Sequence, residues 1–187
     1  MRQSIYQALD KQVFSSKDGY SLVPIRYEDR YDIMQWRNEQ MYHLRQSERL
    51  TKENQDAYFE NVVANLFDQE QPDQILFSLL EGEECVGYGG LVHINWSDQH
   101  AEISFIMKTE LEGNYFLKYW SNYLSLIEQV GFDKLKFHKL FVYAFDLRPQ
   151  LYEVLEKNNY FLDARLKDHC YYLGEYKDVV IHSKIKS

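Results

Sequence analysis

One short segment places a carboxylate and a hydroxyl on a single face of a predicted strand. Residues 101–107 read Ala-Glu-Ile-Ser-Phe-Ile-Met. Because side chains alternate along a strand, Glu102, Ser104 and Ile106 share one face. A carboxylate in this position can take a proton from an incoming cationic group through a water molecule, and glutamate is seldom buried without a partner or a purpose. Glu102 is therefore the leading candidate for a general base, with a cross-strand salt bridge or simple solvent exposure as the alternative.

Other reactive side chains give weaker signals. His43 and His93 could assist proton transfer, but a surface histidine or a hydrogen-bonded core histidine is the more common situation for each. No histidine and acid can be placed beside Cys85, so nothing supports it as a nucleophile. Cys85 and Cys170 are far apart and lack CxxC spacing, and the six histidines are scattered. We therefore predict no metal site and reduced thiols, as in a cytoplasmic protein.

Size and charge narrow the class of protein. The 187 residues are 45% apolar with a net charge of −8, which predicts one folded domain spanning 1–187, with 1–11 as a loose N-terminal arm. The lysines and arginines are scattered, so no basic stripe is available for nucleic acid. No apolar run is long enough to cross a bilayer, and the first ten residues lack an apolar signal core. We expect a cytoplasmic protein that binds neither nucleic acid nor membrane.

The predicted elements follow the order ββ–αα–βββ–α–β–α–ββ, a mixed α/β (α+β) chain with a largely antiparallel sheet. Turn signals at Lys17–Gly19, Gly82 and Gly174 separate hairpin strands, and Thr51 is a good N-cap for the second helix. Glycines at 87, 89 and 90 predict a bulge or a close backbone approach. The predicted strands are 12–15, 20–26, 74–80, 85–94, 101–107, 139–145, 162–172 and 176–185, and the predicted helices are 28–38, 52–68, a helix ending near 130, and 149–158.

The order of these elements and several short phrases resemble the GNAT superfamily of N-acetyltransferases, in particular the ribosomal-protein and amino-sugar acetyltransferase branch. The phrases lie in the expected order over roughly residues 22–185: Val23–Arg26, Trp36-Arg37-Asn38, Val86-Gly87-Tyr88-Gly89-Gly90-Leu91, Ala101-Glu102-Ile103-Ser104-Phe105, Phe137-His138-Lys139-Leu140, and Val154 to Tyr160. The resemblance implies a mostly antiparallel sheet flanked by helices, with splayed central strands. It also implies acetyl-CoA as the co-substrate and, by analogy, a homodimer through the late strands.

The resemblance also implies where CoA binds. Pantetheine would lie along the strand 101–107 and meet backbone groups of Ile106 and Met107, and pyrophosphate would rest on backbone N–H groups at the start of the next helix. The family's glycine-rich loop corresponds here to Leu111-Glu112-Gly113-Asn114-Tyr115-Phe116-Leu117-Lys118, in which only Gly113 is retained. Glu112 would repel phosphate, Lys118 would offset part of that repulsion, and Arg148 at the head of the late helix is a further candidate for the CoA phosphates.

For catalysis, the resemblance implies Glu102 as the general base that deprotonates the acceptor amine. Many relatives protonate the departing thiolate with a tyrosine in the late helix, but the aligned residue is Leu155, so Tyr152 is the substitute candidate, with packing as its alternative role. Trp36 and Arg37 are expected to border the acceptor cleft, and Ser104 shares the strand face of Glu102.

Two functions from different classes fit these observations, and an unrelated α/β protein stays a third reading. The first is an N-acetyltransferase that moves an acetyl group from acetyl-CoA to a small amine, an amino sugar or a protein N-terminus. The second is a GNAT-like module that binds acyl-CoA or a partner with little or no catalysis, and the glycine-poor loop and the missing late tyrosine favour it.

Overall fold

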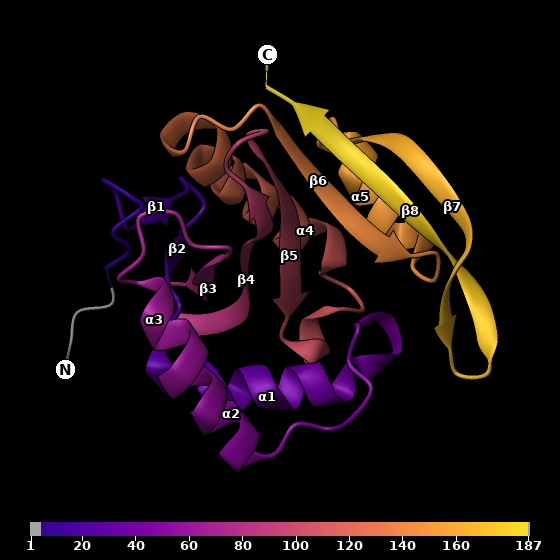
Figure 1. The fold of residues 1–187 in the computed structure, drawn as a ribbon, viewed down its shortest axis with the longest axis horizontal. Helices are drawn as coiled ribbons and strands as arrows, with labels where there is room; N and C mark the ends of the chain where they lie inside the picture. Colours follow the sequence, from indigo (N-terminus) through magenta and orange to yellow (C-terminus); the bar gives the residue numbers. More distant parts are fainter. Residues whose placement is uncertain (1–4, 187) are drawn as a thin grey trace.

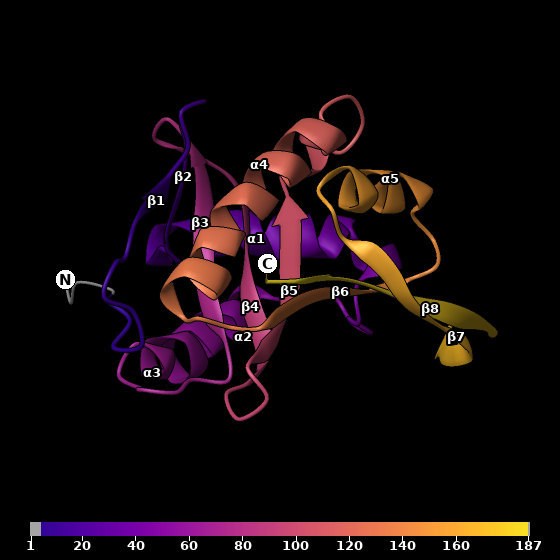
Figure 2. The ribbon, with the colours of Figure 1, turned by 90° about the horizontal axis from the view of Figure 1, so that it is seen from above.

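The computed structural model describes residues 5–186 and shows a single mixed sheet with helices on both faces (Figures 1 and 2). Over these residues the sheet has eight strands in the order β1-β2-β3-β4-β5-β6-β8-β7. All neighbouring strands are antiparallel except β5 and β6, which run parallel. The strands are β1 Phe14–Ser15, β2 Tyr20–Pro24, β3 Ile75–Glu81, β4 Glu84–Asn95, β5 His100–Met107, β6 Lys139–Phe145, β7 Phe161–Tyr172 and β8 Glu175–Ile185.

The helices divide between the two faces of the sheet. Tyr88 of β4 hydrogen-bonds to Arg37 of α1, whereas Phe105, on the opposite face of β5, stacks on Tyr123 of α4 at 4.0 Å between ring centroids. The first pair of helices therefore covers one face, and α4 with α5 covers the other. The helices are α1 Arg30–Glu39, α2 Lys52–Tyr58, α3 Ala64–Leu66, α4 Phe116–Glu128 and α5 Pro149–Lys157, with 3₁₀ turns at Tyr27–Asp29, Met41–His43 and Thr109–Leu111.

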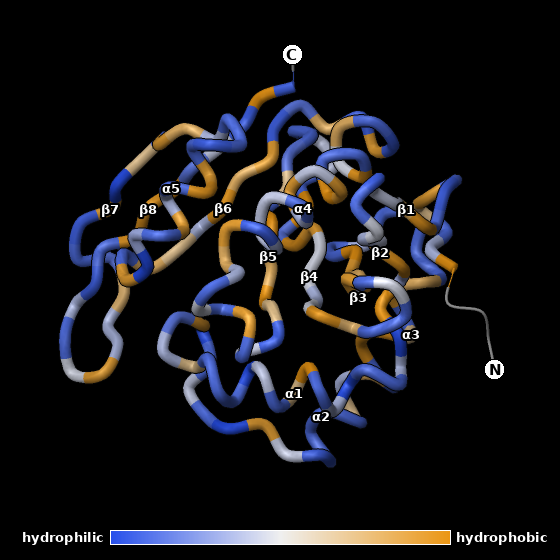
Figure 3. Tube along the Cα trace, turned by 180° about the vertical axis from the view of Figure 1, so that it is seen from behind, coloured by the Kyte–Doolittle hydropathy of each residue, from blue (hydrophilic) through white to orange (hydrophobic). Residues whose placement is uncertain are grey.

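The sequence accounts for most of these elements. Thr51 caps α2 with a reciprocal capping box to Asn54, as predicted for a helix beginning at Lys52. The predicted helix 52–68 is continuous but contains a π-helical segment, Phe59–Val63, between α2 and α3. Helix α1 is mostly hydrophilic (Figure 3), and only Ile33 and Trp36 of it are buried. The amphipathic pattern therefore places each helix correctly, while the π-helical turn has no clear signal in the sequence.

The N-terminal arm differs from expectation. Tyr6 is fully buried, and its hydroxyl both donates to the carbonyl of Leu76 and accepts from the Leu76 N–H. Leu9 is also buried. The prediction of a loose arm is thus wrong for residues 5–11, which pack on β3, and its first four residues lie outside the described part of the chain. Within residues 5–186, no helix has the length and apolar character needed to cross a membrane.

Glycines allow the central strands to approach closely. A Cβ on Gly89 would lie 2.0 Å from the carbonyl oxygen of Ser104, and one on Gly90 would lie 2.0 Å from that of Ile75. Both distances are far below van der Waals contact, so any side chain here would push β4 away from its neighbours. The close backbone approach predicted from the glycine cluster is confirmed.

The two edges of β5 are paired very differently. Against β4 the pairing runs from Gly87–Met107 to Val92–Glu102. Against β6 it covers only residues 100–102, and Glu102 opposite Phe141 is the last pair. From Glu102 onward β5 and β6 diverge (Figure 1), so the splayed central strands are confirmed. We call this point the fork.

Candidate active site

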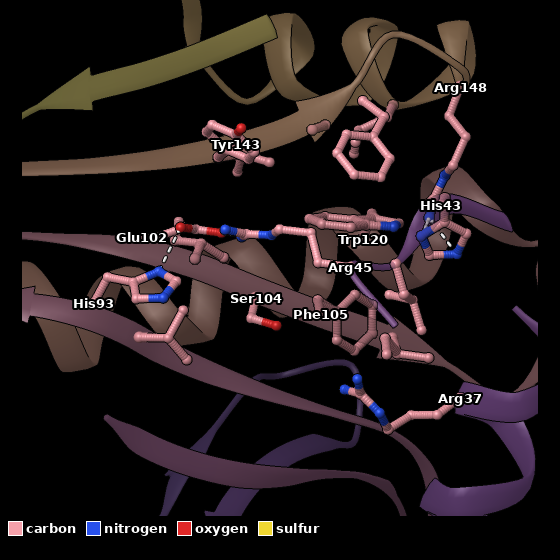
Figure 4. A pocket seen from close by; sticks show the side chains of 18 of the residues that line it. Arg37, His43, Arg45, His93, Glu102, Ser104, Phe105, Trp120, Tyr143 and Arg148 are labelled. Carbon is pink, nitrogen blue, oxygen red and sulfur yellow. Dashed lines mark hydrogen bonds and ion pairs between the residues drawn. The ribbon is translucent and has the colours of Figure 1, made fainter. Parts of the chain in front are cut away.

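A cavity of about 430 Å³ opens in the fork (Figure 4). Its walls come from β5, from the part of β6 beyond the fork, from α1 and the segment that follows it, and from α4 and α5. The lining residues are Arg37, His43, Leu44, Arg45, Gln74, Val92, His93, Glu102, Ile103, Ser104, Phe105, Ile106, Trp120, Val142, Tyr143, Ala144, Phe145, Arg148 and Leu151. Five predicted site residues therefore share one cavity: Arg37, Glu102, Ser104, Ile106 and Arg148.

Glu102 lies at the fork and is 6% exposed. Its Oε1 accepts from Nη2 of Arg45 at 2.5 Å, and its Oε2 lies 2.7 Å from Nδ1 of His93. When the imidazole is neutral, Nδ1–H donates to the carboxylate and Nε2 keeps a free lone pair. A carboxylate that orients an imidazole in this way forms a dyad able to accept a proton at His93 Nε2.

His93 owes its position to an irregular stretch of β4. The β4–β5 register shifts between Val92 and Asn95, and His93 has a φ of 48°, in the left-handed region. A non-glycine residue pays for this conformation, and such strain is common at functional sites. The His93 side chain is 64% exposed, so the free edge of the ring is open to solvent. Sequence reasoning treated His93 as a minor candidate because nothing local pairs it with Glu102.

Arg45 was missed by the sequence analysis. It follows the 3₁₀ turn Met41–His43, far from β5 in the chain, and its guanidinium lies 4.6 Å from the centroid of the Tyr143 ring on β6. Arg45 thus bridges from Glu102 on β5 to β6 across the fork. Its side chain is 49% exposed, so the ion pair is partly screened by water.

The other end of the cavity holds a second basic group. Arg148, immediately before α5, is only 5% exposed, its Nη1 lies 2.7 Å from the ring of His43, and its guanidinium lies 5.0 Å from the Phe116 ring. Its Nε is buried and has no hydrogen-bond partner among residues 5–186. Burial lowers the pKa of Arg148. A buried guanidinium with an unpaired donor is suited to an anionic ligand.

His43 remains neutral at this end. Burial, and next the charge of Arg148, lower its pKa to about 3. Nε2 lies 3.3 Å from Oε1 of Gln40, so the network fits a tautomer in which Nε2 donates to Gln40 and Nδ1 accepts from Arg148. The 3.8 Å contact between His43 and Glu112 is therefore not an ion pair at neutral pH. Glu112 instead faces Nη2 of Arg148, also at 3.8 Å.

The free backbone edge of β5 is offered by different residues from those predicted. The N–H of Lys108 donates to the carbonyl of Val86, so hydrogen-bonded pairs of the antiparallel ladder fall on even-numbered residues of β5. Ile106 consequently exchanges its backbone bonds with β4, and its predicted role toward pantetheine is corrected. The backbone groups of Phe105 and Met107 face the fork, where the Met107 carbonyl accepts from Nε2 of Gln40.

The predicted pyrophosphate loop lies at the N-terminus of α4. Tyr115 is the N-cap residue and makes no side-chain capping bond, so the first N–H groups of the helix are left for other partners. A Cβ on Gly113 would meet nothing within 4 Å, which leaves open space beside the backbone of Gly113. Lys118 is directed elsewhere: its Nζ lies 3.2 Å from Glu81 at the end of β3. Of the predicted loop residues, Gly113, Asn114, Tyr115, Phe116 and Leu117 stay with this proposed site, and Lys118 leaves it.

The predicted thiolate donor, Tyr152, and the predicted acceptor-cleft residue, Trp36, do not line the cavity. The hydroxyl of Tyr152 donates to Asp146 at 2.6 Å, and its ring stacks on His182. Burial and this hydrogen bond raise the pKa of Tyr152, which makes it a poorer proton donor. Trp36 is 5% exposed and borders a separate cavity with Asp29 and Cys85. Both side chains project from a face of their helix that does not point into the cavity, and this is why neither lines it.

Neither a metal nor a nucleophilic cysteine is indicated in the described part of the chain. Among residues 5–186, no three His, Cys, Asp or Glu side chains are placed to hold a metal ion. Burial raises the pKa of the Cys85 thiol to about 12, so the thiolate needed for nucleophilic attack is scarce at neutral pH.

Comparison with known proteins agrees with the fold and the fork. The acetyltransferase (GNAT) domain family matches residues 22–181, so the chain belongs to the GNAT acetyltransferase family. No curated protein shows significant sequence similarity to the chain.

Solved structures share the fold at low sequence identity. The spermidine N-acetyltransferase of Vibrio cholerae in complex with CoA and spermine superposes with a TM-score of 0.76 at 16% identity, covering 89% of this chain and 95% of that one. A probable acetyltransferase gives 0.72 at 18% identity, with 93% and 97% covered, and a putative acetyltransferase gives 0.69 at 14%, with 94% and 87% covered. The expected mixed, mostly antiparallel sheet flanked by helices is confirmed.

Proposed function

We propose that this chain transfers an acetyl group from acetyl-CoA to a primary amine. The observation that carries the proposal is the fork, where β5 loses β6 at Glu102 and leaves a cavity lined by a carboxylate–imidazole dyad. The family match and the CoA-bound neighbour support the same reaction class. Acetyl-CoA supplies an acetyl group activated as a thioester.

The residues of the chain fit this co-substrate. The backbone of Phe105 and the N–H of Met107 give the pantetheine arm a strand edge that β6 leaves unpaired, while the Met107 carbonyl already accepts from Gln40. The N–H groups around Gly113–Leu117 and the unpaired Nε of Arg148 suit the phosphates. Glu112 opposes phosphate by charge, but it lies against Arg148, which offsets part of that repulsion. The acceptor then enters from the α1 side, toward Ser104 and the dyad.

The dyad provides the proton transfer that the reaction needs. Glu102 holds His93 so that Nε2 accepts a proton from the amine, directly or through water. The amine nitrogen then forms a bond to the carbonyl carbon of the thioester, and the carbon–sulfur bond breaks. The nitrogen gives up one further proton and the departing thiolate takes one, so atoms and charges balance. Arg45 holds the Glu102 carboxylate in place throughout.

A second candidate is an acyl-CoA-binding module without turnover. One observation favours it: Leu155 is fully buried at the position where many relatives carry a proton-donating tyrosine, and Tyr152 is bonded to Asp146. Binding of acetyl-CoA without thiol release, with any amine, would select this second function.

The proposed acetyl-CoA site can be tested by a substitution on β6 that fills the fork. Ala144 lines the cavity, and Ala144→Trp should reduce acetyl-CoA affinity about tenfold or more, because the indole occupies the space of the arm. Ala164→Trp on β7, which does not line the cavity, is the matched control. Calorimetry with acetyl-CoA measures binding, and thiol release with a panel of amines measures turnover. Wild-type protein that binds no acetyl-CoA at millimolar concentration would refute the proposed function.

A further inference from the structure

The arginines that line the cavity differ in whether a carboxylate balances their positive charge. Three arginines line the cavity. Arg45 pairs with Glu102 at 2.5 Å, and Arg148 faces Glu112 at 3.8 Å. Within residues 5–186, Arg37 forms no ion pair with a carboxylate. Arg37 is thus a positive charge without a partner, in a chain whose net charge is −8.

Neutral groups hold Arg37 in a fixed position. Its Nε donates to Oε1 of Gln46 at 3.0 Å, and its Nη1 donates to the Tyr88 hydroxyl at 2.7 Å. Gln46 and Tyr88 are both 8% exposed. The guanidinium is therefore preorganised by two buried neighbours, and neither of them neutralises its charge. Since guanidinium groups bind carboxylates through two parallel N–H donors, a fixed and uncompensated arginine is a ready anion site.

Arg37 lies on the side of the cavity from which we expect the acceptor to enter. It comes from α1, on the face of the sheet that carries Glu102 and Ser104, and Figure 4 draws Ser104 between the Glu102–His93 pair and Arg37. Arg37 also lines a second, smaller cavity of about 220 Å³ with apolar walls that include Ile33, Leu50 and Phe59. A ligand bound at Arg37 has room beside it for an apolar group.

We propose that the acceptor amine also carries a carboxylate, which binds Arg37 while the amine faces His93. This inference rests on the proposed function and names its substrate class: amino carboxylates in which a chain of several bonds separates the amine from the carboxylate. Tyr88, which holds Arg37, pairs with Ile106, four residues along β5 from Glu102, a separation of about 13 Å at the rise of a strand. A polyamine fits the same place poorly, because its second cationic group would face the unpaired guanidinium. The spermine-binding neighbour shares the fold, but the uncompensated charge of Arg37 leads us to expect a different acceptor for this chain.

The first experiment measures product binding and needs no turnover. N-acetyl derivatives of glycine, 4-aminobutyrate, 6-aminohexanoate and 8-aminooctanoate, each as the acid and as the amide, are titrated into wild-type protein by calorimetry or NMR. At least one acid should bind about ten- to a hundredfold more tightly than its amide, as a hydrogen bond between charged groups predicts. Arg37→Gln should remove this preference, and Arg37→Lys should keep part of it. The control is Arg30→Gln, on the same helix but outside the cavity.

The second experiment measures turnover with the free amino acids, their amides and spermine. The acids should have the higher kcat/KM, and Arg37→Gln should raise KM for the acids more than for the amides, so that the ratio of the two kcat/KM values falls toward one. The proposal is overturned if no acid binds better than its amide, if the preference survives Arg37→Gln, or if spermine is the better acceptor. Acetyl-CoA binding and thiol release test the proposed function separately, so its failure is recognised independently.

Discussion

The two edges of β5 differ in whether their backbone groups are paired within the sheet. Toward β4 the strand is paired continuously from Glu102 to Met107, and Gly89 lets the two backbones approach, since a Cβ there would lie 2.0 Å from the Ser104 carbonyl. Toward β6 the pairing stops after Glu102, and the edge beyond it faces a cavity. A closed edge supports the sheet, while an open edge leaves backbone donors and acceptors for a ligand. The same strand therefore serves stability on one side and binding on the other, with Glu102 at the transition.

The closed edge should be the more sensitive to substitution. Gly89→Ala places a Cβ 2.0 Å from the Ser104 carbonyl and 2.7 Å from the Tyr123 hydroxyl. Because β5 and α4 cannot both move away without breaking the ladder, we expect a loss of about 3 kcal/mol or more in the free energy of unfolding. Urea denaturation measures it.

Gly113→Ala is the control for this loss, since its Cβ would meet nothing within 4 Å. It should change stability by no more than about 0.5 kcal/mol. Equal stabilities of the two variants would contradict the close packing of the closed edge.

Glu102, where the paired edge of β5 gives way to the open one, should affect the rate of acetyl transfer more than the binding of acetyl-CoA. Glu102→Gln removes the charge that orients His93 and pairs with Arg45, so we expect kcat/KM to fall about a hundredfold while acetyl-CoA affinity stays unchanged. His93→Gln should cost a similar factor, because an amide side chain cannot accept the proton that the imidazole takes.

The double variant distinguishes a dyad from two independent residues. Residues that act as a unit are not additive, so Glu102→Gln with His93→Gln should be about as slow as either single variant. His138→Gln, at an exposed histidine outside the cavity, is the control. If the double variant instead loses the product of the two single-variant factors in kcat/KM, Glu102 and His93 do not act as a unit.

Much of this comparison was predictable from the sequence. Strand alternation identified the shared face of Glu102 and Ser104, and the glycine cluster identified the closed edge. The open edge was predicted from family resemblance alone, because no local pattern states where two strands part. Arg45 was not found for the same reason, because it follows a 3₁₀ turn distant in the chain. His93 was a candidate for proton transfer, but its pairing with Glu102 depends on a register shift that the sequence does not show.

The incorrect residue predictions have a common cause. Lys118 and Tyr152 were chosen for proximity along the helix, but their side chains form other bonds, to Glu81 and to Asp146. Helical spacing fixes which face a residue occupies, while the partner on that face depends on tertiary packing. The prediction for Ile106 was wrong by one position. Alternate residues of β5 direct their backbone groups to β4 and to the fork, and Ile106 is one of those bonded to β4.

The far end of the open edge should show the smallest effect, in the pH dependence of stability. His43 has a pKa lowered to about 3 in the folded chain, against 6.5 as its ordinary value. Between these values the unfolded chain binds a proton that the folded chain excludes, so stability falls as the pH drops from about 6.5 toward 3, by at most about 1.4 kcal/mol per pH unit. His43→Gln removes this contribution and should lose stability less steeply on acidification.

Urea midpoints of both proteins between pH 4 and 7 give the comparison, since the carboxylates that also titrate there are common to the two and cancel in the difference. His138→Gln should run parallel to the wild type. Parallel curves for His43→Gln as well would mean that His43 takes up its proton in the folded chain. Arg148 would then face a second positive charge, and this end of the cavity would be built to hold an anion even more strongly than its neutral histidine indicates.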